Sequence, residues 1–312
     1  DNSSVATNWA EWLIKVGREA LVKQYQKDVY PYIAAKDVAL GTLEERQETY
    51  KVYRLGCLHW NRVALENKSF KEGFYNANSV FLNGDELFRV IAAQGPSPFS
   101  ADKFWHMIYQ EKVSTIVQLC EYVEDYWPRK RPLVFEGFTI SLESQGFIDE
   151  NVPNIQLRTF VVAKEGSSES HRVRHIFFNK WPDFDVPETV APVVAIVQWL
   201  EEHGSMSMQS PLLVHCMAGV GRTGSLILTL MALRFFKSLR NTHQAEFSCQ
   251  DYSTLIMGLA KELRRHRDDA IQTCEQYTFA HAALLKLLVL EGLVPDDDRV
   301  RAYVCERDYV SN

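Results

Sequence analysis

One stretch constrains this chain more than any other: residues 215–224, with the sequence HCMAGVGRTG. An apolar run of strand character, 211–214, precedes it, and 225–236 is apolar enough for a buried helix. A strand, a tight glycine-rich loop and a helix start predict a cradle of backbone N–H groups at the positive end of a helix dipole. The sequence therefore predicts a site for a tetrahedral anion, with phosphate as the best candidate.

Three side chains of this loop can take part in a reaction of the bound anion. Five residues separate Cys216 from Arg222, a spacing that allows the sulfur to lie at the base of the loop and the guanidinium at its rim. The positive field should lower the pKa of Cys216 and make it a nucleophile. Arg222 can bind two phosphoryl oxygens, and Thr223 can donate its hydroxyl to the departing sulfur. The alternative is a structural cysteine beside a chance glycine turn. The presence of Cys216 and Arg222 at this spacing disfavours it.

A loop that can supply a proton precedes the cradle. Residues 181–187, WPDFDVP, combine two prolines with two acids, which predicts a loop. Expelling a phenol oxygen from phosphorus needs an acid, and Asp183 is suitable if partial burial against Trp181 and Phe184 raises its pKa. On composition alone a solvated turn is the better interpretation. The presence of Cys216 favours the catalytic one.

A third segment follows the cradle. Gln272 and Gln276 lie in the sequence QTCEQY, residues 272–277, and side-chain amides of this kind can position a water molecule. An ordinary helix N-cap explains the segment equally well when it is considered alone. Its interpretation therefore depends on the other two loops.

Composition limits the class of protein. The 312 residues are 46% hydrophobic, ample for a core, and the net charge of −6 argues against a general nucleic-acid binder. Six scattered cysteines favour a reducing, cytoplasmic location over a disulfide framework or a zinc site. The longest apolar run, 226–233, is too short to cross a bilayer, and no signal peptide is visible. These features predict a globular protein without a membrane span.

The remaining segments predict an alternation of helices and strands. Helical periodicity or composition marks 9–25, 43–50, 104–109, 189–203, 251–266 and 275–292. β-Branched and aromatic residues mark strands at 116–120, 138–142, 156–162 and 173–178. Residues 51–78 are expected to form a loop, and the acidic run 296–298 with the residues to 312 a solvated end.

The three loops, at Cys216, Asp183 and Gln272, resemble those of the tyrosine-specific branch of the cysteine-dependent protein phosphatases, in the same order. The sequences QGP at 94–96 and NAN at 76–78 are similar to further motifs of that family. Because three separate loops match, coincidence is a poor explanation of the likeness.

This resemblance covers residues 9–290 and implies a fold. The expected class is α/β, with a highly twisted mixed sheet flanked by helices. A single catalytic domain would occupy residues 1–292, followed by a C-terminal tail at 293–312. The resemblance implies neither a metal ion nor any other cofactor.

The resemblance also implies a two-step hydrolysis of phosphotyrosine in proteins. Cys216 would attack phosphorus while Asp183 protonates the departing phenol, which produces a phosphocysteine. Water would then resolve this intermediate, with Asp183 as the base. Gln272 and Gln276 would orient the water, and Thr223 would ease the departure of sulfur.

Further residues would bind the phosphoryl group or support the loop. Asp183, Gln272 and Gln276 would line the site, and His215 would tune the thiolate and hold the loop without transferring protons. Glu124 falls where the family has a glutamate that pairs with the arginine. The loop amides that would hold the phosphoryl oxygens belong to Met217, Ala218, Gly219, Val220, Gly221 and Arg222.

Four positions depart from the family pattern. The substrate-gripping tyrosine falls at Val52 and its acidic partner at Arg54, which weakens the expected phosphotyrosine slot and changes peptide preference. Asp185 replaces the usual glycine of the acid loop, and Met217 replaces a common serine. No reactive group is removed by these changes.

Two other functions remain open. The domain could be a weakly active or inactive phosphatase-like module that binds phosphoproteins or a partner. A dual-specificity or lipid phosphatase is a third possibility, which the glutamine and acid loops disfavour. The sequence predicts phosphotyrosine-containing proteins as partners and no nucleic acid, and it leaves the oligomeric state open.

Overall fold

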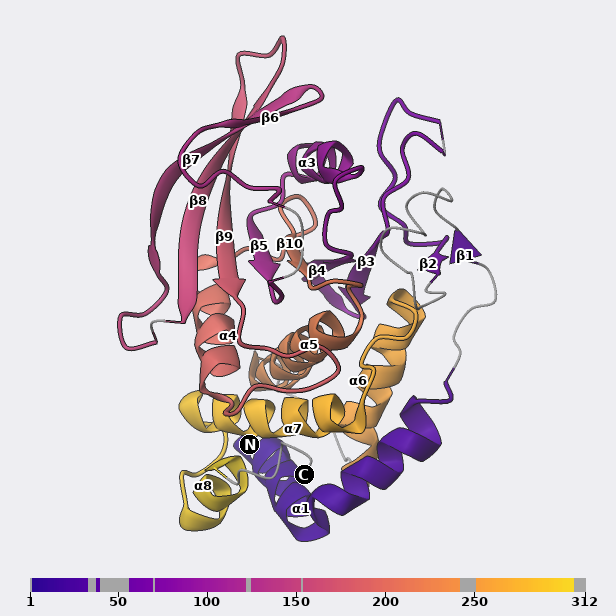
Figure 1. The fold of residues 1–312 in the computed structure, drawn as a ribbon. Helices are drawn as coiled ribbons and strands as arrows, with labels where there is room; N and C mark the ends of the chain where they lie inside the picture. The colour runs from indigo at the N-terminus through magenta and orange to yellow at the C-terminus, as the bar shows by residue number, and fades with distance from the viewer. Residues whose placement is uncertain are drawn as a thin grey trace.

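The computed structural model describes residues 2–32, 38–39, 56–69, 71–121, 125–152, 154–241 and 251–305. A twisted, mixed, eight-stranded sheet lies at the centre, with helices on both faces (Figure 1). The predicted α/β class with a mixed sheet flanked by helices is therefore confirmed. The strands are β3 (Ala77–Leu82), β4 (Asp85–Ala93), β5 (Thr115–Gln118), β6 (Leu133–Phe135), β7 (Phe138–Phe147), β8 (Ile155–Lys164), β9 (Ser170–Phe178) and β10 (Leu212–His215).

The strand order places β10 inside the sheet, third from one edge. The order is β3-β4-β10-β5-β9-β8-β7-β6, and β10 is parallel to both neighbours. His215, the last residue of β10, is opposite Ala93 of β4 and Gln118 of β5. Ligands of open α/β sheets bind at the carboxyl ends of parallel strands. The loop after His215 leaves the sheet at such an edge.

Helices cover the two faces unequally (Figure 1). One face is covered by α4 (Ala191–His203), α5 (Gly221–Asn241), α6 (Ser253–His266) and α7 (Cys274–Leu290), and the other by α3 (Ala101–Gln110). Beyond α7 lie α1 (Asn2–Gln24), the π-helical segment η1 (Tyr25–Val29) and α8 (Asp298–Cys305). A separate pair of short strands consists of β1 (Val38–Ala39) and β2 (Cys57–Leu58).

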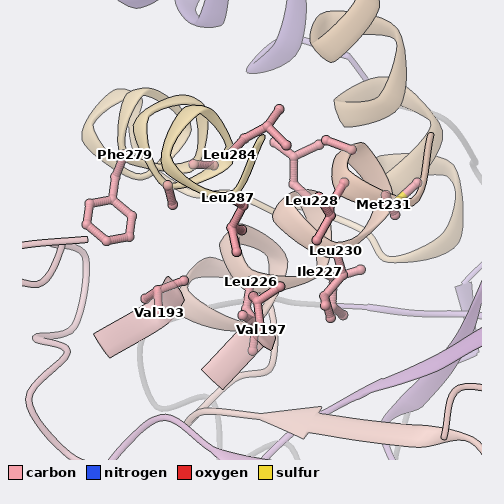
Figure 2. Packing of buried hydrophobic residues seen from close by; sticks show 14 of the residues in the cluster. Val193, Val197, Leu226, Ile227, Leu228, Leu230, Met231, Phe279, Leu284 and Leu287 are labelled. Carbon is pink, nitrogen blue, oxygen red and sulfur yellow. The ribbon is translucent and has the colours of Figure 1, made fainter. Parts of the chain in front are cut away.

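Helix α5, which begins at the end of the cysteine loop, is buried among other elements (Figure 2). Its aliphatic side chains pack in one cluster with Val193 and Val197 of α4 and with Leu284 and Leu287 of α7. A fully buried aliphatic side chain stabilises the fold by about 1.5–3 kcal/mol. This packing holds the first turn of α5, and therefore the end of the cysteine loop, in place.

Most predicted elements are present, but β1, β2, β3, β4 and β6 were not predicted, and β2 lies inside the stretch expected to form a loop. The helices predicted at 9–25, 104–109, 189–203, 251–266 and 275–292 and the four predicted strands are confirmed, with shifted ends. The prediction of a loop up to residue 78 is wrong at its end, because β3 begins at Ala77 and pairs with β4. Asn83-Gly84, with Gly84 at a φ of 78°, is the hairpin-turn signal that reveals this pair. The helix predicted at 43–50 lies outside the described residues.

The prediction of a solvated C-terminal end is wrong for residues 298–305. This segment is helix α8, and it buries Val300, Tyr303 and Val304 against α1 and α7. Asp297 Oδ1 accepts a hydrogen bond from Val300 N at 3.0 Å. The acidic run therefore caps the start of an amphipathic helix, because carboxylates stabilise the free N–H groups of a first turn.

Candidate active site

The cysteine loop is a closed cradle between β10 and α5. Gly219 N lies 3.3 Å from Cys216 Sγ, and the cysteine is only 3% exposed. Gly219 has a φ of 73°, and a Cβ atom there would overlap the carbonyl of Ala93, so glycine is required. Gly95 N, from the QGP sequence, donates to Met217 O at 2.9 Å. The loop is thus attached to the neighbouring strand β4.

The cradle favours an ionised sulfur. Burial raises the pKa of the Cys216 thiol, but the Arg222 guanidinium and hydrogen bonds from Thr223 and Gly219 lower it by more. The net effect is a pKa below the ordinary value. A thiolate stabilised in this way is a nucleophile near neutral pH.

Arg222 joins the cradle to the acid loop. Its side chain is 5% exposed, and one terminal nitrogen lies 3.1 Å from Asp183 Oδ1. The other terminal nitrogen donates to Trp181 O at 3.2 Å. Within the described part of the chain, its buried Nε has no hydrogen-bond partner. One donor of this buried guanidinium is therefore unused in the described structure.

Asp183 faces Arg222 and is not enclosed by aromatic rings. Its side chain is 46% exposed, and although Trp181 is buried, Phe184 is 38% exposed. Phe184 has a φ of 57°, which is unfavourable for a bulky residue and gives the loop a sharp turn. The side chain of Asp183 is therefore partly buried, and its charged partner is the Arg222 guanidinium.

Asp185 makes one side-chain contact and two main-chain contacts at the acid loop. Its Oδ1 accepts a hydrogen bond from Val186 N at 2.8 Å, and its carbonyl accepts one from Trp181 Nε1 at 2.9 Å. Gln276 Nε2 donates to the same carbonyl at 3.5 Å. The acid loop therefore contacts the glutamine segment as well as the cradle.

The glutamine segment is both a helix cap and a wall of the cradle. Thr273 and Gln276 form a reciprocal capping box at the start of α7. A Cβ atom on Gly221 would overlap Gln272 Oε1 and lie 3.1 Å from Gln276 Nε2. Both amides therefore lie against the end of the cysteine loop.

His215 lies beneath the loop, fully buried. Its Nδ1 is 3.0 Å from Cys216 O, and its Nε2 is 2.7 Å from the Tyr126 hydroxyl. Burial lowers the pKa of His215 to about 4, despite the opposing effect of the hydrogen bond to Cys216 O. The imidazole is neutral at neutral pH. Tyr126 is also 3.2 Å from Gln118 Oε1, which lies 2.9 Å from His175 Nε2, so a buried polar network supports the cradle from below.

The sequence interpretation missed Arg267. This residue is 1% exposed, and its Nε and one terminal nitrogen donate to Gly219 O and Ala218 O, both at 3.0 Å. The other terminal nitrogen contacts Asn76 Oδ1 and Asn78 Oδ1, both at 2.7 Å. The NAN sequence therefore orients an arginine that binds the outward carbonyls of the cradle. Arg267 gave no sequence signal, because it lies in a run of basic residues at the end of a helix.

We expect Arg267→Lys to lower the free energy of unfolding by about 2–4 kcal/mol, because an ammonium group cannot reach all four oxygens and leaves buried acceptors unsatisfied. Urea denaturation measures this change. Arg265→Lys is the matched control, since Arg265 lies in the last turn of α6, two residues before Arg267, but its side chain is 53% exposed. If Arg267→Lys and Arg265→Lys unfold at the same urea concentration, this role of Arg267 is contradicted.

Several predicted features lie outside the described residues: Glu124, Val52 and Arg54. In the residues that are described, no group of three or more His, Cys, Asp or Glu side chains could hold a metal ion. None of the described helices combines the length and apolar character needed to span a membrane.

Comparisons with known proteins relate this chain to one family. The family model described as Protein-tyrosine phosphatase matches residues 47–286. The chain is 32% identical over 238 residues to the Gallus gallus receptor-type tyrosine-protein phosphatase eta, covering 73% of this chain and 16% of that protein. It is 31% identical over 246 residues to the Rattus norvegicus tyrosine-protein phosphatase non-receptor type 7, covering 76% and 63%. The chain thus spans less than two thirds of each relative's length. It belongs to the protein-tyrosine phosphatase family.

Proposed function

We propose that this chain hydrolyses phosphotyrosine in proteins through a phosphocysteine intermediate on Cys216. The observation that carries the proposal is the buried Cys216 thiol, whose pKa is lowered by Arg222 within a cradle of loop amides. Oriented N–H groups and a guanidinium stabilise the charge that develops on the phosphoryl oxygens in the transition state. The amides of Met217, Ala218, Gly219, Val220, Gly221 and Arg222 would hold the phosphoryl oxygens, and Gly219 N already lies 3.3 Å from Cys216 Sγ.

In the first step the thiolate of Cys216 attacks phosphorus and the bond from phosphorus to the tyrosine oxygen breaks. Asp183 transfers its proton to that oxygen, so phenol leaves neutral. The free Nε of Arg222 and the terminal nitrogen now paired with Asp183 would bind two phosphoryl oxygens. The incoming phosphoryl group would thereby release the carboxyl of Asp183 toward the leaving group.

In the second step water attacks phosphorus and the phosphorus–sulfur bond breaks. Gln272, with Gln276, orients the water, and Asp183, now a carboxylate, accepts its proton. Thr223 donates a hydrogen bond to the departing sulfur of Cys216, which is consistent with its effect on the thiol pKa. Inorganic phosphate leaves and the thiolate is restored.

His215 acts through the loop and not through proton transfer. Its imidazole is neutral, buried and bound to both Cys216 O and Tyr126. A neutral ring beneath the cysteine holds the loop in shape without placing a second titrating group beside the sulfur.

The second candidate is a phosphatase-like module that binds phosphoproteins with little or no turnover. The observation that favours it is the ion pair of Asp183 with Arg222, which occupies a donor that the substrate needs. Within the acid loop, the Asp185 carboxylate also accepts a hydrogen bond from Val186 N. Phosphotyrosine-containing proteins are the proposed partners under both functions, and a cytoplasmic location stays a prediction.

The test compares phosphate release from four substrates: a small aryl phosphate, a phosphotyrosine peptide, a phosphoserine peptide and a phosphoinositide vesicle. The proposal expects release from the first two that depends on Cys216. Binding of the phosphotyrosine peptide without release, in wild type as in Cys216→Ser, would instead support the binding module. Release mainly from the last two substrates would indicate a phosphatase of another specificity.

A further inference from the structure

Ile271, the residue before Gln272, has an unfavourable backbone conformation. Its φ is 67°, in the left-handed region that β-branched residues rarely adopt. Such conformations persist when the surrounding structure holds them, and they cluster at functional sites. The direction of the backbone at Ile271 decides where the side chain of Gln272 begins, so whatever holds Ile271 also positions Gln272.

Three hydrogen bonds hold the backbone N–H and carbonyl of Ile271. Ile271 N donates to Val220 O, in the cysteine loop, at 3.0 Å. Ile271 O accepts two hydrogen bonds, from the Tyr25 hydroxyl at 2.8 Å and from a terminal nitrogen of Arg264 at 2.9 Å. Arg264 Nε donates to the preceding carbonyl, Ala270 O, at 2.9 Å. Two of the three bonds therefore fix one carbonyl oxygen next to Gln272.

Tyr25 comes from the opposite end of the chain. It is 3% exposed, and its ring packs against Tyr30 and Tyr277, with centroid distances of 6.0 and 5.6 Å. Burial raises the pKa of the Tyr25 hydroxyl above its ordinary value, so the group keeps its proton and remains a donor near neutral pH. Another terminal nitrogen of Arg264 donates to Tyr30 O at 3.1 Å, which joins the same two segments a second time.

We infer that Tyr25 of segment η1 is a positioning residue for the second step: its hydroxyl holds Ile271 so that Gln272 directs water onto the phosphocysteine. This inference rests on the proposed function. The N-terminal helical region then helps to decide whether water or another nucleophile attacks the intermediate. The first step does not need Gln272 and should not depend on Tyr25.

The experiment uses the full chain with Tyr25→Phe, which removes the hydroxyl and keeps the ring. Rapid mixing with an aryl phosphate separates the burst of phenol, which reports the first step, from steady turnover. The expected result is an unchanged burst rate and hydrolysis of the intermediate slower by about three- to tenfold, the effect of losing one hydrogen bond.

A second readout is specific to positioning. Glycerol added to the reaction competes with water: its hydroxyl oxygen attacks phosphorus, the phosphorus–sulfur bond breaks, and its proton passes to Asp183. The ratio of glycerol phosphate to inorganic phosphate should rise in Tyr25→Phe, because a misplaced Gln272 selects water less well. A purely structural role would lower stability without moving this ratio.

Thr7→Val is the matched control. It removes a comparable hydrogen bond made by the N-terminal helix, from Thr7 Oγ1 to Leu293 O at 3.2 Å, beyond the far end of α7 from Gln272. An unchanged ratio in Tyr25→Phe, or an equal rise in Thr7→Val, would overturn the inference. If wild type shows no turnover that depends on Cys216, the proposed function fails first, and the inference falls with it.

Discussion

Replacement of Cys216 by serine is expected to reduce phosphotyrosine hydrolysis by at least about 10³-fold, because a serine hydroxyl in the same cradle is not ionised and cannot form the intermediate. The cradle itself should survive. Arg222 and the loop amides remain in Cys216→Ser, so the variant should still bind a phosphotyrosine peptide. Phosphate release and peptide binding, measured on the same preparation, test both parts of this expectation.

Cys274→Ser is the control for this experiment. Cys274 is another free cysteine, at the start of α7, and burial and the neighbouring Glu275 raise the pKa of its thiol to about 11. Its replacement should leave hydrolysis nearly unchanged. Because the pKa of Cys216 is lowered, iodoacetamide should alkylate Cys216 at a lower pH than Cys274. Equal hydrolysis by Cys216→Ser and wild type would refute the nucleophile assignment.

Replacement of Asp183 by asparagine is expected to reduce turnover of a phosphotyrosine peptide by about 10²–10⁴-fold, the usual loss on removing a general acid. The amide cannot give a proton to the departing phenol. The loss should be smaller for aryl phosphates whose phenols are more acidic, because such leaving groups need less protonation. Steady-state rates with a series of substituted aryl phosphates measure this dependence.

The same loop offers a matched carboxylate. Asp185→Asn removes an equal charge, but asparagine can still accept the hydrogen bond from Val186 N. We expect its turnover to remain within about threefold of wild type, since the loss of a surface charge two residues away has a small effect. If Asp185→Asn loses as much activity as Asp183→Asn, then charge in the loop matters more than a specific proton donor.

The cradle was predictable because its parts are contiguous. A strand, a glycine loop and a helix start lie within residues 211–236, and their geometry follows from local backbone rules. The acid and glutamine loops were weaker signals, since each has an ordinary alternative as a turn or a helix cap. In the structure Gln276 is both a cap and a neighbour of the cradle, so neither interpretation of that segment excluded the other.

Other parts of the site were not predictable from any one stretch. Tyr126, beneath His215, and Arg267, behind Gly219, contact the loop only because the chain folds back on itself. Tyr25 is 246 residues from the carbonyl that it binds. A buried tyrosine hydroxyl or guanidinium has the same local sequence signature as an ordinary core or surface residue.

The sequence by itself therefore determined the reactive groups of this protein and the loop that carries the nucleophile, because short-range spacing and backbone conformation decide them. The tertiary structure alone decided which distant donors hold those loops. It showed that Asp183 pairs with Arg222, that Ile271 is held in an unfavourable conformation, and that α8 packs onto the core. These facts depend on ion pairs, hydrogen bonds and burial between separate segments of the chain, for which no local sequence pattern exists.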